Sequence, residues 1–113
     1  MNYIENPFDC PVTRTMSLIG GKWKPIILNI LGMGTIRFGK LNHMIPAISN
    51  KMLSSELKQL EELQLIERLV YKEIPPRVEY QLTEKGKSLM PILYAMADWG
   101  NSEIAKELTA LEK

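Results

Sequence analysis

The chain has 113 residues, a net charge of +1 and 45% hydrophobic residues, which fits one globular domain and leaves no room for two. Its single cysteine excludes an intrachain disulfide, and one cysteine with one histidine is too small a set for a metal site, so we expect no metal and no cofactor. No apolar run approaches the roughly 20 residues of a membrane span, and the first residues lack the pattern of a secretory signal. We therefore expect one cytoplasmic domain over residues 1–113 that does not contact a membrane.

Positive charge is concentrated in the middle of the chain. Residues 20–77 carry nine Lys and Arg against five Glu, a balance of +4, whereas residues 1–19 have a balance of −1 and residues 78–113 a balance of −2. A polyanionic partner would therefore contact the middle of the chain. A balance of +4 is also small enough to arise by chance, so charge alone does not establish such a partner.

Two helices are predicted in the first third of the chain. Pro11 suits the first position of a helix, and the helix within residues 8–20 ends at the glycine pair that follows Ile19. One face of this helix contains Val12, Thr15, Met16 and Ile19. A second helix is expected from Trp23 to Leu31, because its apolar residues recur with the helical period and two glycines follow closely.

The third and fourth helices are predicted to be packed neighbours. Residues 35–36 are long enough only for a strand stub, and a short third helix then has apolar positions at Phe38, Leu41 and Ile45. Ser49 is a good N-cap for the fourth helix, with Ile48 and Leu53 at the two positions of a hydrophobic staple. This helix should run to about Leu63, and only about six residues separate it from the third helix.

The hydrophobic period changes after the fourth helix. Residues 66–72 and 78–82 read as two strands, and the segment KEIPPR between them contains two prolines that cannot donate ladder hydrogen bonds, which predicts a protruding loop. Thr83 should cap a final helical region whose apolar stripe continues to the end of the chain. Pro91 is expected to kink this region, and residues 99–101 to break it in two.

The fourth helix has a polar amino-terminal half. Its first two turns carry Ser49, Asn50, Lys51, Ser54 and Ser55, and its end carries Glu61 and Glu62. The second helix of a helix-turn-helix enters the DNA major groove by its amino-terminal residues, where hydroxyls, amides and lysines meet base edges and phosphates. A solvated helix with an ordinary cap would show the same pattern, so the helix alone leaves both interpretations open.

The proline loop adds the order of elements that is typical of a winged helix. Lys72 and Arg77 flank Ile74-Pro75-Pro76, so the loop is stiff and is bracketed by cations. Stiff cations lose little entropy on docking to DNA. A surface hairpin with two solvated charges is the alternative, and only the helix pair and the hairpin together favour DNA binding.

The residues also resemble a known family. The strings DCPVTRTMSLIGGKWKPIILNIL, RFGKL, ISNKMLSSELKQLEELQLIER, YKEIPPRVEYQLTEKGKSLMPIL and ADWG are similar to those of HxlR-type bacterial transcription regulators over roughly residues 9–100. The resemblance implies a mainly α fold with a small β-hairpin, a MarR-like winged helix-turn-helix, and a homodimer that binds operator DNA. Repression is the commoner mode in that family.

The resemblance assigns roles to parts of this chain. The first helix (8–20) and the C-terminal helices (83–113) would form the dimer, and residues 22–82 would hold the helix-turn-helix and wing. The residues expected to contact DNA are Ser49, Asn50, Lys51, Met52, Ser54, Ser55, Lys58, Lys72 and Arg77, with Arg37 and Lys40 as further phosphate contacts. The residues expected at the dimer interface are Val12, Met16, Leu93, Met96, Trp99, Ile104 and Leu108. No polar constellation specifies a small-molecule effector.

Cys10 is a candidate redox-sensing residue. It precedes Pro11, so it should lie at the amino end of the first helix, where the helix dipole favours a thiolate. Arg14 would help the thiolate and Asp9 would oppose it. Some HxlR-type regulators use a cysteine at this Cys-Pro position to sense oxidants or electrophiles. The alternative is a small side chain that packs at the dimer contact.

An enzyme is not expected, because His43 has no acidic partner nearby in sequence and Cys10 has no evident base. Lys22 and Lys24 should lie on the exposed side of the second helix. The main rival to a DNA-binding regulator is a helical protein-interaction module without DNA binding, since the last 30 residues carry a long apolar stripe. Salt separates the two, because binding to phosphates weakens steeply as salt rises.

Overall fold

The computed structural model describes residues 9–111, apart from the side chain of Ala105. Residue 8 of the predicted first helix and residues 112–113 of the predicted C-terminal segment lie outside the described residues. In chain order the elements are α1 (Pro11–Ile19), α2 (Trp23–Leu31), β1 (Ile36–Arg37), α3 (Phe38–Met44), α4 (Asn50–Glu62), β2 (Ile66–Tyr71), β3 (Arg77–Leu82), α5 (Glu84–Trp99), η2 (Gly100–Ile104) and α6 (Ala105–Leu111). The fold is mainly helical with one small antiparallel sheet, as predicted.

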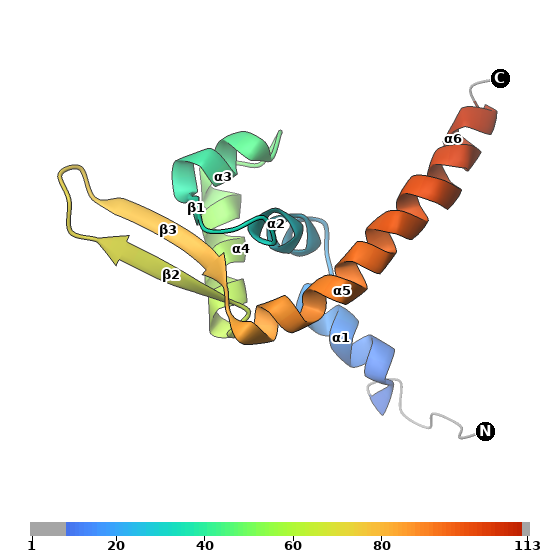
Figure 1. Cartoon of the computed structure of the whole chain (residues 1–113), viewed down its shortest axis with the longest axis horizontal. Coiled ribbons are helices and arrows are strands. Elements are labelled where there is room, and N and C mark those ends of the chain that lie inside the picture. Colours follow the sequence, from blue (N-terminus) through green and yellow to red (C-terminus); the bar gives the residue numbers. More distant parts are fainter. Residues whose placement is uncertain (1–8, 112–113) are drawn as a thin grey trace.

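Two long elements project from a central body. α2, α3 and α4 pack with the base of the sheet, and the β2–β3 hairpin extends from this body on one side (Figure 1). α5, η2 and α6 form a long helical rod on another side, and α1 lies beside the α5 part of it (Figure 1). The order and arrangement are those of a winged helix with an added terminal helix on each side of the body.

α4 forms as its sequence predicts. The Ser49 side chain accepts a hydrogen bond from the backbone N–H of Met52 at 3.0 Å, which satisfies one of the free amides at the start of the helix. Leu53, Leu57 and Leu60 are fully buried, so one face of the helix belongs to the core. The opposite face is left to solvent along its whole length.

The β2–β3 register gives the hairpin two distinct faces. Arg68 is paired with Tyr80, and Tyr71 is paired with Arg77. Because neighbouring side chains on a strand alternate, the inner face, which looks toward α4, carries Ile66, Arg68, Val70, Val78, Tyr80 and Leu82. The outer face carries Glu67, Leu69, Tyr71, Arg77, Glu79 and Gln81. β1 adds a third strand at the side of β3, which confirms the predicted strand stub.

α5 begins in close contact with the body. The Thr83 side chain accepts from the Gly86 N–H at 3.0 Å and donates to the Gln64 carbonyl at 2.6 Å, so the cap also fastens α5 to the end of α4. A Cβ atom on Gly86 would lie 2.1 Å from the Leu65 carbonyl oxygen, so only glycine fits there. These contacts explain why the rod leaves the body at a fixed place.

The helices differ from the sequence predictions at Leu93 and Lys24. Leu93, expected at the dimer interface, is 5% exposed and belongs to the chain's own core, because α5 packs on α2 before it leaves the body. The predicted division at residues 99–101 is where α5 ends and the π-helical turn η2 begins, although η2 continues the rod into α6 (Figure 1). Lys24 is not on the exposed side of α2, because its side chain is only 14% exposed and contacts α4.

Candidate nucleic-acid interface

The amino-terminal half of α4 is an exposed polar surface. The exposed side chains of this half are those of Ser49, Asn50, Lys51, Met52, Ser54 and Ser55. Lys51 makes no ion pair within residues 9–111, so its charge is available to a partner. Ser49 also caps the helix, and Ser55 accepts a 3.4 Å hydrogen bond from Gln59. These groups are the kinds that meet base edges and phosphates at the start of a recognition helix.

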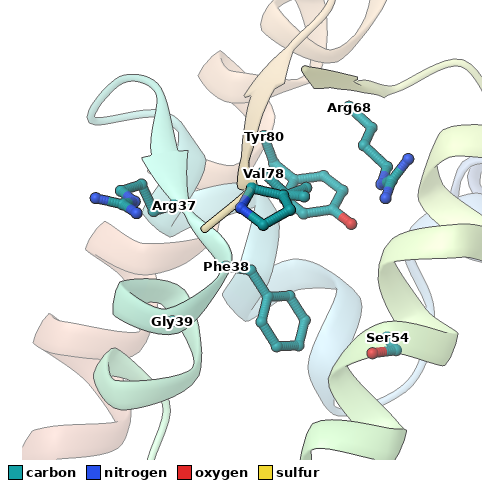
Figure 2. A pocket seen from close by; sticks show the side chains of 8 residues that line it. Arg37, Phe38, Gly39, Ser54, Arg68, Val78 and Tyr80 are labelled. Carbon is teal, nitrogen blue, oxygen red and sulfur yellow. The ribbon is translucent and has the colours of Figure 1, made fainter. Parts of the chain in front are cut away.

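Three further cations predicted to contact DNA are exposed around this half of α4. Lys58 lies on α4 one turn beyond Ser54, and Lys40 lies on α3. Arg37 is at the start of α3 and is exposed, but its side chain points away from the space between α3 and the hairpin (Figure 2). Lys58 therefore extends the polar surface of α4, while Lys40 lies on α3 and Arg37 at the start of α3.

The two cations that flank the proline loop have different surroundings. Lys72 is exposed beside the loop, as expected. Arg77 lies on the outer face, where its guanidinium stacks over Tyr71 at 4.1 Å and is 3.4 Å from the Glu73 carboxylate and 3.7 Å from that of Glu79. Strand alternation turns Arg77 to the side of the hairpin away from α4, and two acids lie beside it there, so the structure gives no support to its predicted contact with DNA.

A hollow of about 420 Å³ separates α4 from the inner face of the hairpin. The residues that line it are Arg37, Phe38, Gly39, Ser54, Arg68, Pro76, Val78 and Tyr80. Figure 2 shows the Arg68 side chain reaching toward α4 and the Tyr80 hydroxyl directed to the same side as Ser54. Sequence reasoning missed Arg68 and Tyr80, and only the β2–β3 register, which places them opposite each other, could have found them.

Cys10 lies at the N-cap of α1, as predicted, and its side chain is half-buried. The pKa of its thiol is lowered from the ordinary value, first by the backbone N–H of Thr13, then by that of Val12, with Arg14 making the smallest contribution. The sulfur does not complete a capping hydrogen bond, so we attribute the shift to the partial positive charge of the helix amino end. Arg14 is directed to the Asp9 carbonyl, to which it donates at 2.9 Å.

An apolar groove of about 440 Å³ runs between α1 and α5. It is lined by Pro11, Val12, Thr15, Met16, Ile19, Ile92 and Met96. The rod beyond the groove also carries exposed apolar side chains, since Trp99 is 59% exposed and Leu108 is 56% exposed. Of the residues predicted at a dimer interface, all except Leu93 are exposed large apolar side chains.

The described residues offer no site for metal chemistry. Within residues 9–111, no three His, Cys, Asp or Glu side chains lie close enough together to hold a metal ion. His43 is exposed in the last turn of α3. None of the described helices is long and apolar enough to span a membrane.

Comparisons with known proteins agree with this geometry. Residues 18–108 match the model of the HxlR-like helix-turn-helix family. An HTH-type transcriptional regulator of Methanothermobacter thermautotrophicus is 49% identical over 96 residues, which cover 85% of this chain and 73% of the relative.

Two solved structures are also similar. A transcriptional regulator of the MarR family from Porphyromonas gingivalis superposes with a TM-score of 0.84 at 40% identity, covering 90% of this chain and 99% of that one. The redox regulator HypR in its reduced form superposes with a TM-score of 0.82 at 39% identity, covering 87% of this chain and 99% of that one. The family and these relatives are transcriptional regulators and not enzymes. The chain therefore belongs to the HxlR family of helix-turn-helix transcriptional regulators, with a MarR-like winged-helix fold.

Proposed function

We propose that the protein binds operator DNA as a homodimer, with the amino-terminal half of α4 in the major groove and the hairpin loop on the adjacent backbone or minor groove. The observation that carries this proposal is that α4 has two faces. One face is made of buried leucines, and the other is exposed and polar and carries no acidic side chain in its first two turns. A helix that served only the core would not need hydroxyls, an amide and an unpaired lysine on that face.

Each predicted contact has a role in this arrangement. Asn50, Lys51 and Ser54 are placed to reach base edges or phosphates, and Met52, which is 42% exposed, can contact a thymine methyl group. The contacts proposed with the sugar–phosphate backbone are those of Ser49, Ser55, Lys58, Lys40, Arg37 and Lys72. Arg77 is left out because its own acids hold it on the outer face.

The homodimer is proposed to form through α1 and the rod. The apolar groove between α1 and α5 and the exposed side chains of Trp99, Ile104 and Leu108 are apolar surfaces that a second copy would bury. A dimer presents two α4 helices, so the operator should contain two half-sites about one helical turn apart or a multiple of it. Bound at a promoter, such a dimer in the cytoplasm would act as a repressor.

The test starts with duplexes selected by the wild-type protein from a random-sequence pool. Affinity for the selected duplex should fall steeply as salt rises, and Lys51→Ala should weaken it and change the preferred sequence. Lys87→Ala is the matched control, because Lys87 is an exposed lysine at the start of α5. The start of α5 lies near the carboxyl end of α4 and not near its amino-terminal half. If no duplex is enriched, or if Lys51→Ala binds as the wild type does, the protein-interaction module becomes the better interpretation.

Thiol-based sensing through Cys10 is a second proposed property. It is supported by the lowered pKa of Cys10, by its half-exposed position beside the apolar groove, and by the similarity to HypR, which has been solved in reduced and oxidised forms. With one cysteine per chain, a disulfide must join two subunits or a subunit and a small thiol. In the intersubunit case, hydrogen peroxide takes two electrons and two protons from two Cys10 thiols and leaves as two water molecules.

Such a bond would change the spacing of the two hairpins, and therefore the fit to the operator. The experiment compares DNA binding of wild type and Cys10→Ser before and after peroxide. A response that survives in Cys10→Ser excludes Cys10 as the sensor, and a wild type that does not respond excludes sensing of peroxide. Either result favours the alternative, in which Cys10 only packs at the dimer contact.

A further inference from the structure

Three hydrogen-bond donors from three different elements face the hollow between α4 and the hairpin. They are the Arg68 guanidinium of β2, the Tyr80 hydroxyl of β3 and the Ser54 hydroxyl of α4 (Figure 2). We propose that this hollow is a phosphate-binding pocket, in which Arg68, Tyr80 and Ser54 together hold one backbone phosphate of the DNA strand that borders the major groove. The proposal rests on the proposed function, and two of its three residues, Arg68 and Tyr80, were not suggested by the sequence.

Tyr80 gives the first reason. Tyr80 packs in the core and is only 7% exposed. Within residues 9–111 the Tyr80 hydroxyl makes no hydrogen bond with another residue, and because it opens onto the hollow it is free to donate to a ligand there. A ligand with an acceptor oxygen would accept that hydrogen bond.

The charge of the hollow gives the second reason. No carboxylate lines it, and Arg68 makes no ion pair in the described part of the chain. The acids of the hairpin are elsewhere, since Glu67 and Glu79 lie on the outer face and Glu73 pairs with Arg77. The pocket therefore combines an uncompensated guanidinium with neutral donors, which suits an anion with several acceptor oxygens.

The position of the hollow identifies the anion as a phosphate of DNA. Ser54 lies on α4 one turn from Asn50 and Lys51, the residues proposed to enter the major groove. Pro76, at the other side of the hollow, belongs to the loop proposed to lie on the backbone. A strand that runs from the groove to the hairpin must pass this point, so one phosphate per half-site can settle there.

The first experiment measures affinity for the selected duplex with single-residue variants. Tyr80→Phe keeps the buried ring and removes only the hydroxyl, and should weaken binding about three- to tenfold with unchanged thermal unfolding. Arg68→Ala should weaken binding about ten- to a hundredfold and lower the salt slope by about one unit, equally for selected and unrelated duplexes. Lys87→Ala is again the control for loss of an exposed cation.

The second experiment identifies the phosphate. Each phosphate of the selected duplex is replaced in turn by a neutral methylphosphonate, and both wild type and Arg68→Ala are titrated with each duplex. At one position in each half-site, the methylphosphonate should weaken DNA binding by the wild type but should not weaken binding by Arg68→Ala any further. The reason is that the two changes remove the same contact. Losses that add at every position would overturn the proposal.

The source of the phosphate is tested by adding inorganic phosphate at constant ionic strength. If inorganic phosphate displaces DNA no more strongly than chloride does, the result supports a pocket that binds a phosphate only as part of the DNA strand. Weak binding of free phosphate that displaces DNA and disappears in Arg68→Ala would instead identify a site for a small phosphorylated ligand, and would overturn the assignment to DNA. If Lys51→Ala loses sequence preference while Arg68→Ala and Tyr80→Phe bind normally, the pocket is wrong and the proposed function stands.

Discussion

Lys24 on α2 and Glu56 on α4 form an ion pair of 2.7 Å with both side chains about 85% buried, at 14% and 15% exposure. The Lys24 ammonium also donates to the Gln59 side-chain oxygen at 2.6 Å, so it holds two positions one turn apart on α4. Gln59 in turn donates to Ser55 on the same helix. The pair therefore fixes the rotation of α4, and through Gln59 it is linked to Ser55 in the exposed amino-terminal half.

Removing one member of this pair should destabilise the fold. Glu56→Ala leaves the Lys24 charge largely buried without its carboxylate, and we expect a loss of about 2–3 kcal/mol in the free energy of unfolding. Urea titration followed by circular dichroism gives the value. The exposed pair Lys87–Glu84 is the control, and Glu84→Ala should change stability by less than about 1 kcal/mol. Equal effects of Glu56→Ala and Glu84→Ala would show that burial of the first pair has no energetic consequence.

Lys24 also shows where sequence reasoning reached its limit for the fold. The start, cap and buried stripe of α4 are local features, so Ser49 and Leu53 could be assigned from the sequence alone. Which face of α2 meets α4 depends on the packing angle between two helices, and no local pattern reports it. Leu93 was misassigned for the same reason, because an apolar stripe does not say which part meets the core and which part a second chain.

For the candidate site, the sequence predicted which side chains of the helix are exposed better than it predicted which face of the hairpin each residue occupies. Lys51 follows a capped helix start, and its exposure follows from the helical period. Arg77 and Arg68 instead depend on strand register, since a shift of one residue exchanges the inner and outer faces. The prolines predicted a protruding loop, but they did not fix which side of it each arginine occupies.

Gly86 should be irreplaceable where α5 meets the body. In Gly86→Ala the new methyl group would be 2.1 Å from the Leu65 carbonyl oxygen, so backbone must move, and we expect a loss of more than about 2 kcal/mol in stability. Gly39→Ala, in α3, is the matched change, because nothing lies within 4 Å of the new atom. There the gain in helix propensity should leave stability unchanged or raise it by up to about 1 kcal/mol. A stable Gly86→Ala protein would mean that α5 can shift along the body.

The alkylation rate of Cys10 should rise at a lower pH than the alkylation rate of an ordinary thiol does. Only the thiolate reacts, and the Thr13 and Val12 amides lower the pKa of Cys10, so the rate with iodoacetamide should rise to half its maximum below the pH seen for a free cysteine. In urea-unfolded protein the midpoint should move up to the ordinary value. The Thr13 hydroxyl makes a further, smaller contribution to the lowered pKa of Cys10, so Thr13→Val should move the midpoint up by less than unfolding does. A midpoint that is the same in folded and unfolded protein would contradict the assignment of the shift to the start of α1.

The oligomeric state should depend on apolar residues of the rod. Leu108→Glu places a carboxylate among the exposed apolar side chains of α6, and Trp99→Glu does the same in α5. Burying that charge against a second copy is unfavourable. Both variants should therefore sediment as monomers at concentrations where the wild type is a dimer. Ile74→Glu is the control, because Ile74 is fully exposed in the loop between β2 and β3, and this hairpin projects from a different side of the body than the rod (Figure 1). Dimer dissociation should also respond little to salt, in contrast to DNA release. If Leu108→Glu and Ile74→Glu both remain dimeric, the second copy binds elsewhere, and the spacing of the two α4 helices must be derived from another interface.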